Sequence, residues 1–241
     1  TPLGRDIVAR AQTLLQEAED LVDVARAARD PMTGPLRLGV IPTIGPFLVP
    51  RVMPDLRAQY PRMQLYLREE QTARLLARLQ SGELDAAILA LPYPTEGLET
   101  QDIAGDRFSL VCPRTHRLAA ARVVRSGDIA LEDLLLLEDG HCLRDHALAA
   151  CHLEGARRNV SFQGTSLQTL VQMVANGLGV TLLPQIALDA GSLRGLDLAV
   201  VPLDGEAPAR RIGLVWRSTS GRKETFVRLA GTLAASARPT P

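Results

Sequence analysis

Short apolar runs alternate with longer amphipathic stretches along most of the chain, and this order constrains the fold more than any other feature. We expect strands at Leu36–Ile41, Met63–Glu69, Asp85–Leu91, Phe108–Cys112, Leu134–Glu138, Val160–Gln163, Val180–Leu183, Leu198–Pro202 and Arg211–Trp216. We expect helices at Gly45–Tyr60, Thr72–Ser81, Leu143–His152, Ser166–Ala175 and Lys223–Ala235. Strands separated by helices are typical of parallel sheets with helices on their faces. The sequence therefore predicts an α/β fold.

A longer helix is expected before the first strand. Residues 5–30 contain neither glycine nor proline, and the pattern stops at Pro31 and Gly34. Its apolar positions alternate steps of four and three, which is a heptad pattern, at Ile7, Ala11, Leu14, Ala18, Leu21, Ala25 and Ala28. We interpret residues 1–33 as a linker or dimerisation helix. The alternative is a surface helix packed on its own domain.

Composition excludes several classes of protein. The chain has 241 residues, 46% of them apolar, which is enough for one large core or two smaller ones. Its 27 basic and 27 acidic residues balance, which argues against a nucleic-acid surface covering the chain. No apolar run approaches the ~18 residues that a membrane span needs. The chain begins TPLGRD, without a methionine, inside a helical stretch, so we expect a fragment of a longer protein.

Two threonines stand where helices begin after neighbouring strands. Thr43 lies in IPTIGPFLVP, after the first strand, and Thr72 begins the helix after the second. Such helix starts direct backbone N–H groups into the crevice where open α/β sheets bind ligands. Simple N-capping is the alternative for each threonine, but two together favour a shared pocket.

Two cysteines bracket the segment EDGHCLRDHALAAC, residues 138–151. They could be buried apolar residues, metal ligands, a structural bridge or a redox pair. Three cysteines in all are too few for a secreted disulfide scaffold. Cys142 and His146 share a helix face, but zinc prefers about four ligands. Cys112, at the end of an apolar strand, is expected to be a buried hydrophobe, with His116 on a surface loop.

The sequence resembles a known family. Three segments look like the effector domain of LysR-type transcriptional regulators: GPLRLGVIPTIGPFLVPRVMPDLRAQYP, LREEQTARLLARLQSGELDAAIL and SLQTLVQMVANGLGVTLLP. More narrowly, LLEDGHCLRDHALAAC resembles the peroxide-sensing members of that family. The resemblance covers essentially the whole chain. It implies a periplasmic-binding-protein-like fold with two α/β subdomains joined by two crossover strands, at residues 35–104 with 208–241 and at 105–207.

The same resemblance implies a site and its partners. Cys142 would be the peroxidatic thiol and Cys151 the resolving thiol, with Thr43, Thr72, His141 and Arg217 around the first. Hydrogen peroxide and a thiol reductant would be its reactants, without a cofactor or a metal. The protein would be a cytoplasmic regulator, not an enzyme, that forms dimers or tetramers. It would bind promoter DNA through an N-terminal domain missing from this sequence, and it could contact RNA polymerase.

Helix geometry adds a constraint on the cysteine pair. Gly140 is expected to make a turn that places Cys142 at a helix N-terminus, where partial positive charge favours the thiolate. On an intact helix, Cys151 would lie roughly 13 Å further along and on the opposite face. A disulfide needs Cα atoms within about 7 Å, so a bridge would require the helix to unwind.

Two other functions remain open. An ordinary LysR-type effector domain would bind a small organic anion between its subdomains, with the cysteines incidental. A thiol peroxidase would turn peroxide over continuously.

Overall fold

The computed structural model describes residues 1–27, 30–150, 164–204 and 210–237. The helices are α1 (Pro2–Ala27), α2 (Gly45–Gln59), α3 (Thr72–Gln80), η1 (Arg117–Ala120), α4 (Ser126–Ile129), α5 (Cys142–Ala150), α6 (Leu167–Ala175), α7 (Gln185–Asp189) and α8 (Lys223–Ala237). The strands are β1 (Gly34–Val40), β2 (Met63–Glu69), β3 (Ala86–Leu91), β4 (Leu98–Asp106), β5 (Phe108–Pro113), β6 (Thr181–Pro184), β7 (Leu198–Pro202) and β8 (Arg210–Arg217). The predicted α/β class is confirmed.

The chain divides into two compact units. The first comprises Thr1–Ile41, Val49–Ala104 and Ile212–Pro241, and the second comprises Pro42–Leu48 and Gly105–Arg211. The chain therefore crosses from one unit to the other four times, and two of the crossings fall within β4 and β8.

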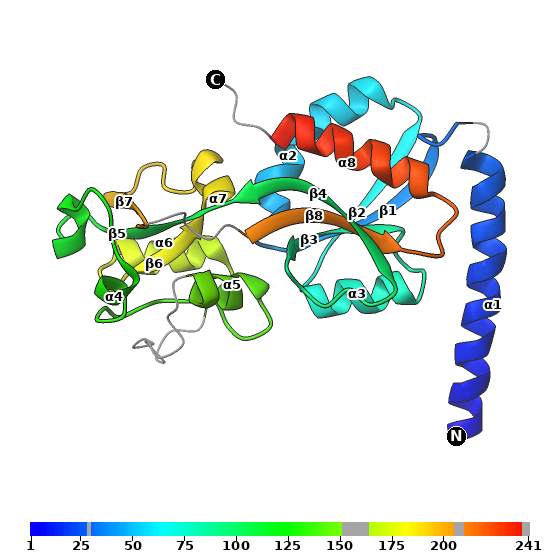
Figure 1. Cartoon of the computed structure of the whole chain (residues 1–241), viewed down its shortest axis with the longest axis horizontal. Helices are drawn as coiled ribbons and strands as arrows, with labels where there is room; N and C mark the ends of the chain where they lie inside the picture. Colours follow the sequence, from blue (N-terminus) through cyan, green and yellow to red (C-terminus); the bar gives the residue numbers. More distant parts are fainter. Residues whose placement is uncertain (28–29, 151–163, 205–209, 238–241) are drawn as a thin grey trace. The chain divides into compact units, whose positions relative to one another are not determined.

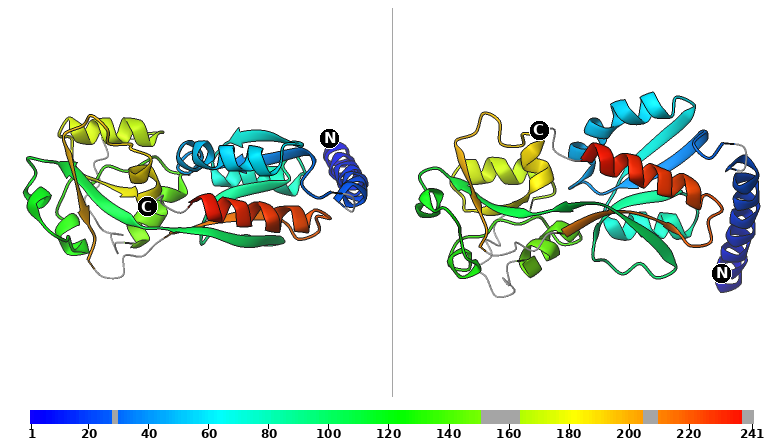
Figure 2. Two further views of the ribbon diagram at one scale, coloured as in Figure 1. Left: turned by 90° about the horizontal axis from the view of Figure 1, so that it is seen from above. Right: turned by 45° about the horizontal axis from the view of Figure 1, so that its top comes forward.

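The first unit is built on a five-stranded sheet in the order β2-β1-β3-β8-β4. β1 runs parallel to β2 and to β3, as predicted. Helices α2 and α8 cover one face of this sheet and α3 covers the other (Figures 1 and 2). All six residues of the central strand β3 are buried, which is typical of a strand covered on both faces. Each fully buried leucine adds about 1.5–3 kcal/mol to the stability of such a core.

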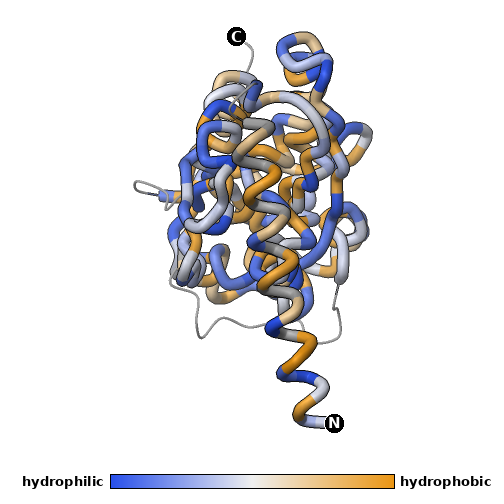
Figure 3. Tube along the Cα trace, turned by 90° about the vertical axis from the view of Figure 1, so that its right-hand side faces the viewer, coloured by the Kyte–Doolittle hydropathy of each residue, from blue (hydrophilic) through white to orange (hydrophobic). Residues whose placement is uncertain are grey.

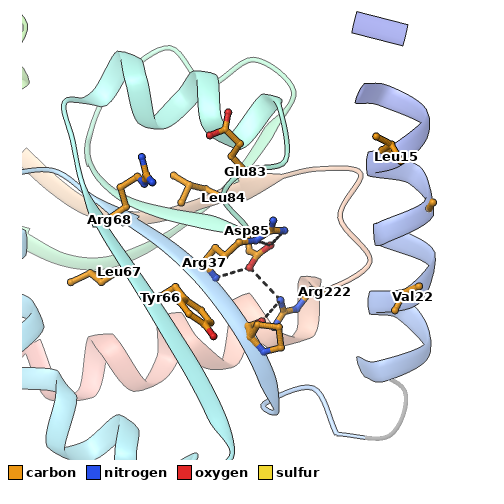
Figure 4. Close-up of a pocket in the computed structure, with 12 residues that line it drawn as sticks. Leu15, Val22, Arg37, Tyr66, Leu67, Arg68, Glu83, Leu84, Asp85 and Arg222 are labelled. Atoms are coloured by element: carbon orange, nitrogen blue, oxygen red, sulfur yellow. Dashed lines mark hydrogen bonds and ion pairs between the residues drawn. The ribbon is translucent and has the colours of Figure 1, made fainter. Parts of the chain in front are cut away.

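A buried ion-pair network joins β1 to the start of α8. Asp85 is 5% exposed and accepts hydrogen bonds from the Arg37 backbone N–H (2.6 Å) and the Arg37 Nη2 (2.9 Å). Arg222 Nη1 lies 3.4 Å from Asp85 Oδ2, the oxygen that also accepts from the Arg37 backbone N–H, and 2.9 Å from the Pro35 carbonyl (Figure 4). The network fixes the amino-terminal ends of β1 and β3 against the segment that leads into α8.

The second unit contains a three-stranded sheet in the order β6-β5-β7. β5 pairs antiparallel with both neighbours, so our expectation of parallel sheets throughout is wrong for this unit. Short apolar runs indicate burial but do not fix strand direction, which depends on how the chain returns to the sheet. Helices α5 and α6 pack on the core of this unit through Leu143, Leu148 and Leu170.

The observed strands differ from the predicted ones at two places. The predicted strand at Leu134–Glu138 forms only isolated bridges, from Leu134 to Val180 and from Leu137 to Gly164. Conversely, β4 was not predicted, because its sequence LETQDIAGD is largely polar and its strand lies at a sheet edge. The predicted strand at residues 160–163 lies outside the described residues.

The predicted N-terminal helix is present as α1. Seven of its large apolar side chains are exposed, and Figure 3 shows hydrophobic positions recurring along the helix. Those with large exposed fractions are Leu3, Ile7, Val8, Leu14, Leu15, Leu21 and Val22. An exposed apolar stripe of this length is typical of a helix that associates with another surface. The dimerisation role stays a prediction.

We expect Gly179→Ala to destabilise the second unit. An alanine Cβ at this position would lie 2.1 Å from the Asp133 carbonyl oxygen. Because this oxygen belongs to the backbone, it cannot shift without a cost in free energy. Overpacking of this kind costs roughly 1–3 kcal/mol. Urea unfolding measures the loss, and Gly127→Ala, whose Cβ would meet nothing within 4 Å, is the matched control. Equal free energies of unfolding for the two variants would contradict the close contact.

Candidate functional site

Cys142 is the first residue of α5 and is 6% exposed. The turn before it depends on Gly140, whose φ is +96°. A residue with a Cβ atom would be strained in this conformation. On the far side of the turn, Leu143 and Ala147 hold α5 on the core of the second unit. The structure thus confirms the predicted turn and places the thiol at a helix N-terminus, where the backbone N–H groups favour a thiolate.

The ionisable residues beside Cys142 add little net positive charge. His141 is 6% exposed, and burial lowers its pKa, while the carboxylate of Glu138, 3.8 Å from Nε2, acts in the opposite direction. Arg144 forms an ion pair with Asp139 across the turn. The guanidinium charge of Arg144 is therefore shared with a carboxylate, and a neutral His141 adds no charge. The helix N-terminus is the stronger source of positive potential at the thiol.

The lowered pKa of His141 predicts a pH-dependent stability. The unfolded chain binds a proton at this histidine more readily than the folded chain does, so stability is lost as pH falls below about 6.5. We expect the wild type to lose more free energy of unfolding than His141→Gln between about pH 7.5 and pH 5.5. Urea titrations at the two pH values measure this difference. Parallel losses in both proteins would show that burial does not depress this group.

Thr43 is held by a buried arginine. Arg210 donates from Nη1 to the Thr43 hydroxyl oxygen (3.1 Å) and from Nη2 to the Thr43 carbonyl oxygen (3.0 Å). Its Nε donates to Asp106 (2.8 Å), and the Arg210 side chain is completely buried. The N-capping alternative therefore does not describe the hydroxyl contact of Thr43. Sequence reasoning did not single out Arg210 or Asp106, because no local pattern links two charged residues about a hundred positions apart.

Thr72 begins α3, as predicted, but it is not the residue that caps it. The N-cap is Gln71, which makes no side-chain capping hydrogen bond. Thr72 is 2% exposed, and its Oγ1 makes no hydrogen bond to any part of the chain that the structure describes. A buried hydroxyl that makes no such bond, at the first turn of a helix, can hydrogen-bond a polar atom of a ligand.

Arg217, the last residue of β8, is 9% exposed. Its Nη1 donates to the carbonyl oxygens of Leu79 (2.8 Å) and Leu84 (3.3 Å), at the end of α3 and before β3. These contacts link the end of β8 to the last turn of α3 and to the residue before Asp85. The predicted role of Arg217 beside the thiol stays a prediction.

The candidate residues are divided between the two units. Thr43, His141 and Cys142 belong to the second unit, and Thr72 and Arg217 belong to the first. Cys151 lies outside the described residues.

The other titratable groups were predicted with mixed success. Cys112 is completely buried, and burial raises its thiol pKa, with a further contribution from the Glu132 carboxylate, as suits a core residue. His116 lies in the loop before η1, as expected, but its side chain is only partly exposed and makes specific contacts. Its Nδ1 accepts from the Leu118 backbone N–H (3.3 Å), which caps η1, and its Nε2 lies 3.1 Å from Glu132.

Two further searches of the described ranges gave negative results. Among those residues, no three histidine, cysteine or acidic side chains are grouped to hold a metal ion. No described helix has the length and apolar character to cross a membrane.

Comparison with known proteins agrees with the expected resemblance. The family model described as the LysR substrate binding domain matches residues 29–238. The HTH-type transcriptional regulator EstR of Acinetobacter baylyi is 41% identical over 226 residues, covering 94% of this chain and 75% of that protein. The DNA-binding transcriptional dual regulator OxyR of Escherichia coli is 40% identical over 235 residues, covering 98% and 77%.

A solved structure supports the fold. The reduced regulatory domain of OxyR2 from Vibrio vulnificus superposes with a TM-score of 0.80 at 43% identity, covering 85% of this chain and 96% of that one. This match confirms the periplasmic-binding-protein-like fold and the narrower resemblance to OxyR. The chain belongs to the family of LysR-type transcriptional regulators.

Proposed function

We propose that this chain is the linker helix and regulatory domain of a peroxide-responsive LysR-type transcription factor. One observation carries the proposal: Cys142 is the buried first residue of α5, directly after the Gly140 turn. The similarity to the regulator OxyR and to the reduced regulatory domain of OxyR2 supports it.

The first step is oxidation of Cys142. The thiolate sulfur attacks one peroxide oxygen, the O–O bond breaks, and the departing hydroxide takes a proton and leaves as water. The product is a sulfenic acid. Thr43, Thr72, His141 and Arg217 are the side chains that we assign to binding the peroxide and stabilising the departing oxygen.

The second step is disulfide formation with Cys151. The Cys151 thiol attacks the sulfenic sulfur and releases a second water molecule. A thiol reductant later returns the pair to two thiols by exchange and is itself oxidised to a disulfide. The cycle is stoichiometric and serves signalling.

The helix makes this second step a conformational switch. Residues 142–150 are helical, and Cys142 and Cys151 are nine positions apart. Extending the helix would put roughly 13 Å of axial rise between them, against the ~7 Å between Cα atoms that a disulfide allows. Residues 140–151 must therefore refold when the bridge forms, and α5 leaves its position on the core.

The refolded segment would act through subunit packing. In this proposal residues 1–33 are the linker and dimerisation helix, and residues 35–104 with 208–241 and residues 105–207 are the two regulatory subdomains. Homo-oligomers would bind promoter DNA through an N-terminal domain, contact RNA polymerase, and reside in the cytoplasm. The exposed apolar positions of α1 support the association of subunits.

Titration of the reduced protein with hydrogen peroxide, followed by peptide mapping, tests the proposal. We expect near-stoichiometric peroxide to give a peptide that links Cys142 to Cys151. Recovery of both thiols unmodified at modest excess would sink the proposal. It would favour the alternative, an effector domain for a small organic ligand in which the cysteines have no redox role.

A further inference from the structure

One buried cluster lies where three separate chain segments pass between the two units. Thr43 follows the crossing after Ile41, Asp106 follows the crossing after Ala104, and Arg210 precedes the crossing after Arg211. All three residues belong to the second unit, and none is more than 2% exposed. The cluster thus joins the residue that we assign to peroxide binding to the ends of both crossover strands.

Asp106 is the anchor of this cluster. One carboxylate oxygen accepts from Arg210 Nε (2.8 Å) and the other accepts from the Ile186 backbone N–H (3.0 Å). Both oxygens are therefore engaged, and the side chain is 1% exposed. A carboxylate held at both oxygens is a fixed anchor for Arg210, whose guanidinium is held by this contact together with its two contacts to Thr43.

The fixed guanidinium determines what the Thr43 hydroxyl can do. Arg210 carries only donors, so its Nη1 occupies a lone pair of the hydroxyl oxygen (3.1 Å). The hydroxyl proton must then point away from Arg210, and Thr43 becomes a donor for another group. The second contact, from Nη2 to the Thr43 carbonyl (3.0 Å), prevents the residue from rotating as a whole.

We propose that Asp106 is a positioning residue for peroxide reduction: through Arg210 it keeps the Thr43 hydroxyl oriented as a hydrogen-bond donor to the departing peroxide oxygen. The inference rests on the proposed function. It adds a residue that does not touch the peroxide but determines how readily peroxide, rather than any electrophile, reacts with Cys142.

Two rate constants of reduced, folded protein test this role. One is the rate of Cys142 oxidation by hydrogen peroxide in stopped flow, and the other is its rate of alkylation by iodoacetamide, which has no peroxide oxygen to stabilise. We expect Thr43→Val to slow oxidation by about 100-fold, as loss of a donor to developing charge does. We expect Asp106→Asn to slow oxidation by roughly 10- to 100-fold. Alkylation should stay within about twofold in both, because positioning leaves the thiol itself unchanged.

The double variant separates positioning from an unrelated structural effect. If Asp106 acts through Thr43, Asp106→Asn combined with Thr43→Val should be no slower than Thr43→Val alone. Losses that multiply in the double variant, or a wild-type oxidation rate in Asp106→Asn, would overturn the inference. If Asp106→Asn does not fold, Asp106→Glu takes its place. It keeps the charge but moves the guanidinium, and an unchanged oxidation rate there would be equally decisive against the inference.

Asp85→Asn is the matched control. It removes the charge from another buried aspartate that pairs with arginine, in the first unit and outside the proposed site. We expect its oxidation rate to equal that of the wild type, and an equal slowing in both variants would assign the effect to stability alone. Failure of the wild type to react with peroxide would instead refute the proposed function.

Discussion

Replacing Cys142 by serine should abolish peroxide-driven disulfide formation. A serine hydroxyl is not ionised near neutral pH and is not oxidised by peroxide, so neither the sulfenic acid nor the bridge can form. We expect the rate of thiol loss to fall to the background of the remaining cysteines. Mass spectrometry of the reduced variant after addition of one equivalent of peroxide measures this directly.

Cys112→Ala is the control for this substitution. Cys112 is completely buried in β5, and burial raises the pKa of its thiol, so it should not compete for peroxide. The variant should form the Cys142–Cys151 disulfide at the wild-type rate. A peroxide-dependent disulfide that persists in Cys142→Ser, or that disappears in Cys112→Ala, would show that the reactive thiol is misassigned.

Replacing Cys151 by serine should change the product completely without preventing the first reaction. Cys142 can still attack peroxide, but no second thiol is available within the chain to condense with the sulfenic acid. We expect a dimedone adduct on Cys142 in most molecules of the variant and in few of the wild type. Peptide mapping after peroxide treatment in the presence of dimedone gives both fractions.

The rate at which α5 opens decides how much the dimedone adduct yields of Cys151→Ser and the wild type differ. In the wild type the sulfenic acid survives only until Cys151 reaches it. In Cys151→Ser it persists until an external thiol or a second peroxide removes it. Equal adduct yields in the two proteins would mean that Cys151 is not the resolving thiol.

Sequence periodicity predicted the elements that are apolar and locally regular. β2 and β7 have the predicted bounds, and α5 begins one residue before its predicted start. The turn before α5 was predictable because Gly140 is the residue that its backbone conformation favours. The position of these elements depends on residues that are close in sequence, so local sequence patterns can predict it.

The features that were missed depend on tertiary contacts. β4 has the largely polar sequence LETQDIAGD, which lacks the regular apolar alternation that marks a half-buried strand. The direction of β5 against β6 and β7 follows from chain topology. The contact of Arg210 with Thr43 joins residues separated by 167 positions, and nothing in either local sequence requires it.

The energetics of the switch follow from how α5 is packed. Leu143, Ala147 and Leu148 are buried on the core, so unwinding α5 exposes apolar surface worth about 1.5–3 kcal/mol for each leucine. Formation of the disulfide must offset this loss. Reduction of the bridge removes the constraint, and burial of the same side chains then restores the helix. The proposed switch would therefore be bistable through one covalent bond.

Hydrogen exchange of α5 in the reduced and peroxide-oxidised protein tests the central claim most directly. The amides of residues 146–150 should be protected in the reduced protein by hydrogen bonds within the helix. They should lose that protection once the Cys142–Cys151 disulfide has formed, while α6 in the same unit stays protected. A fully formed disulfide with the protection of α5 unchanged would contradict the account.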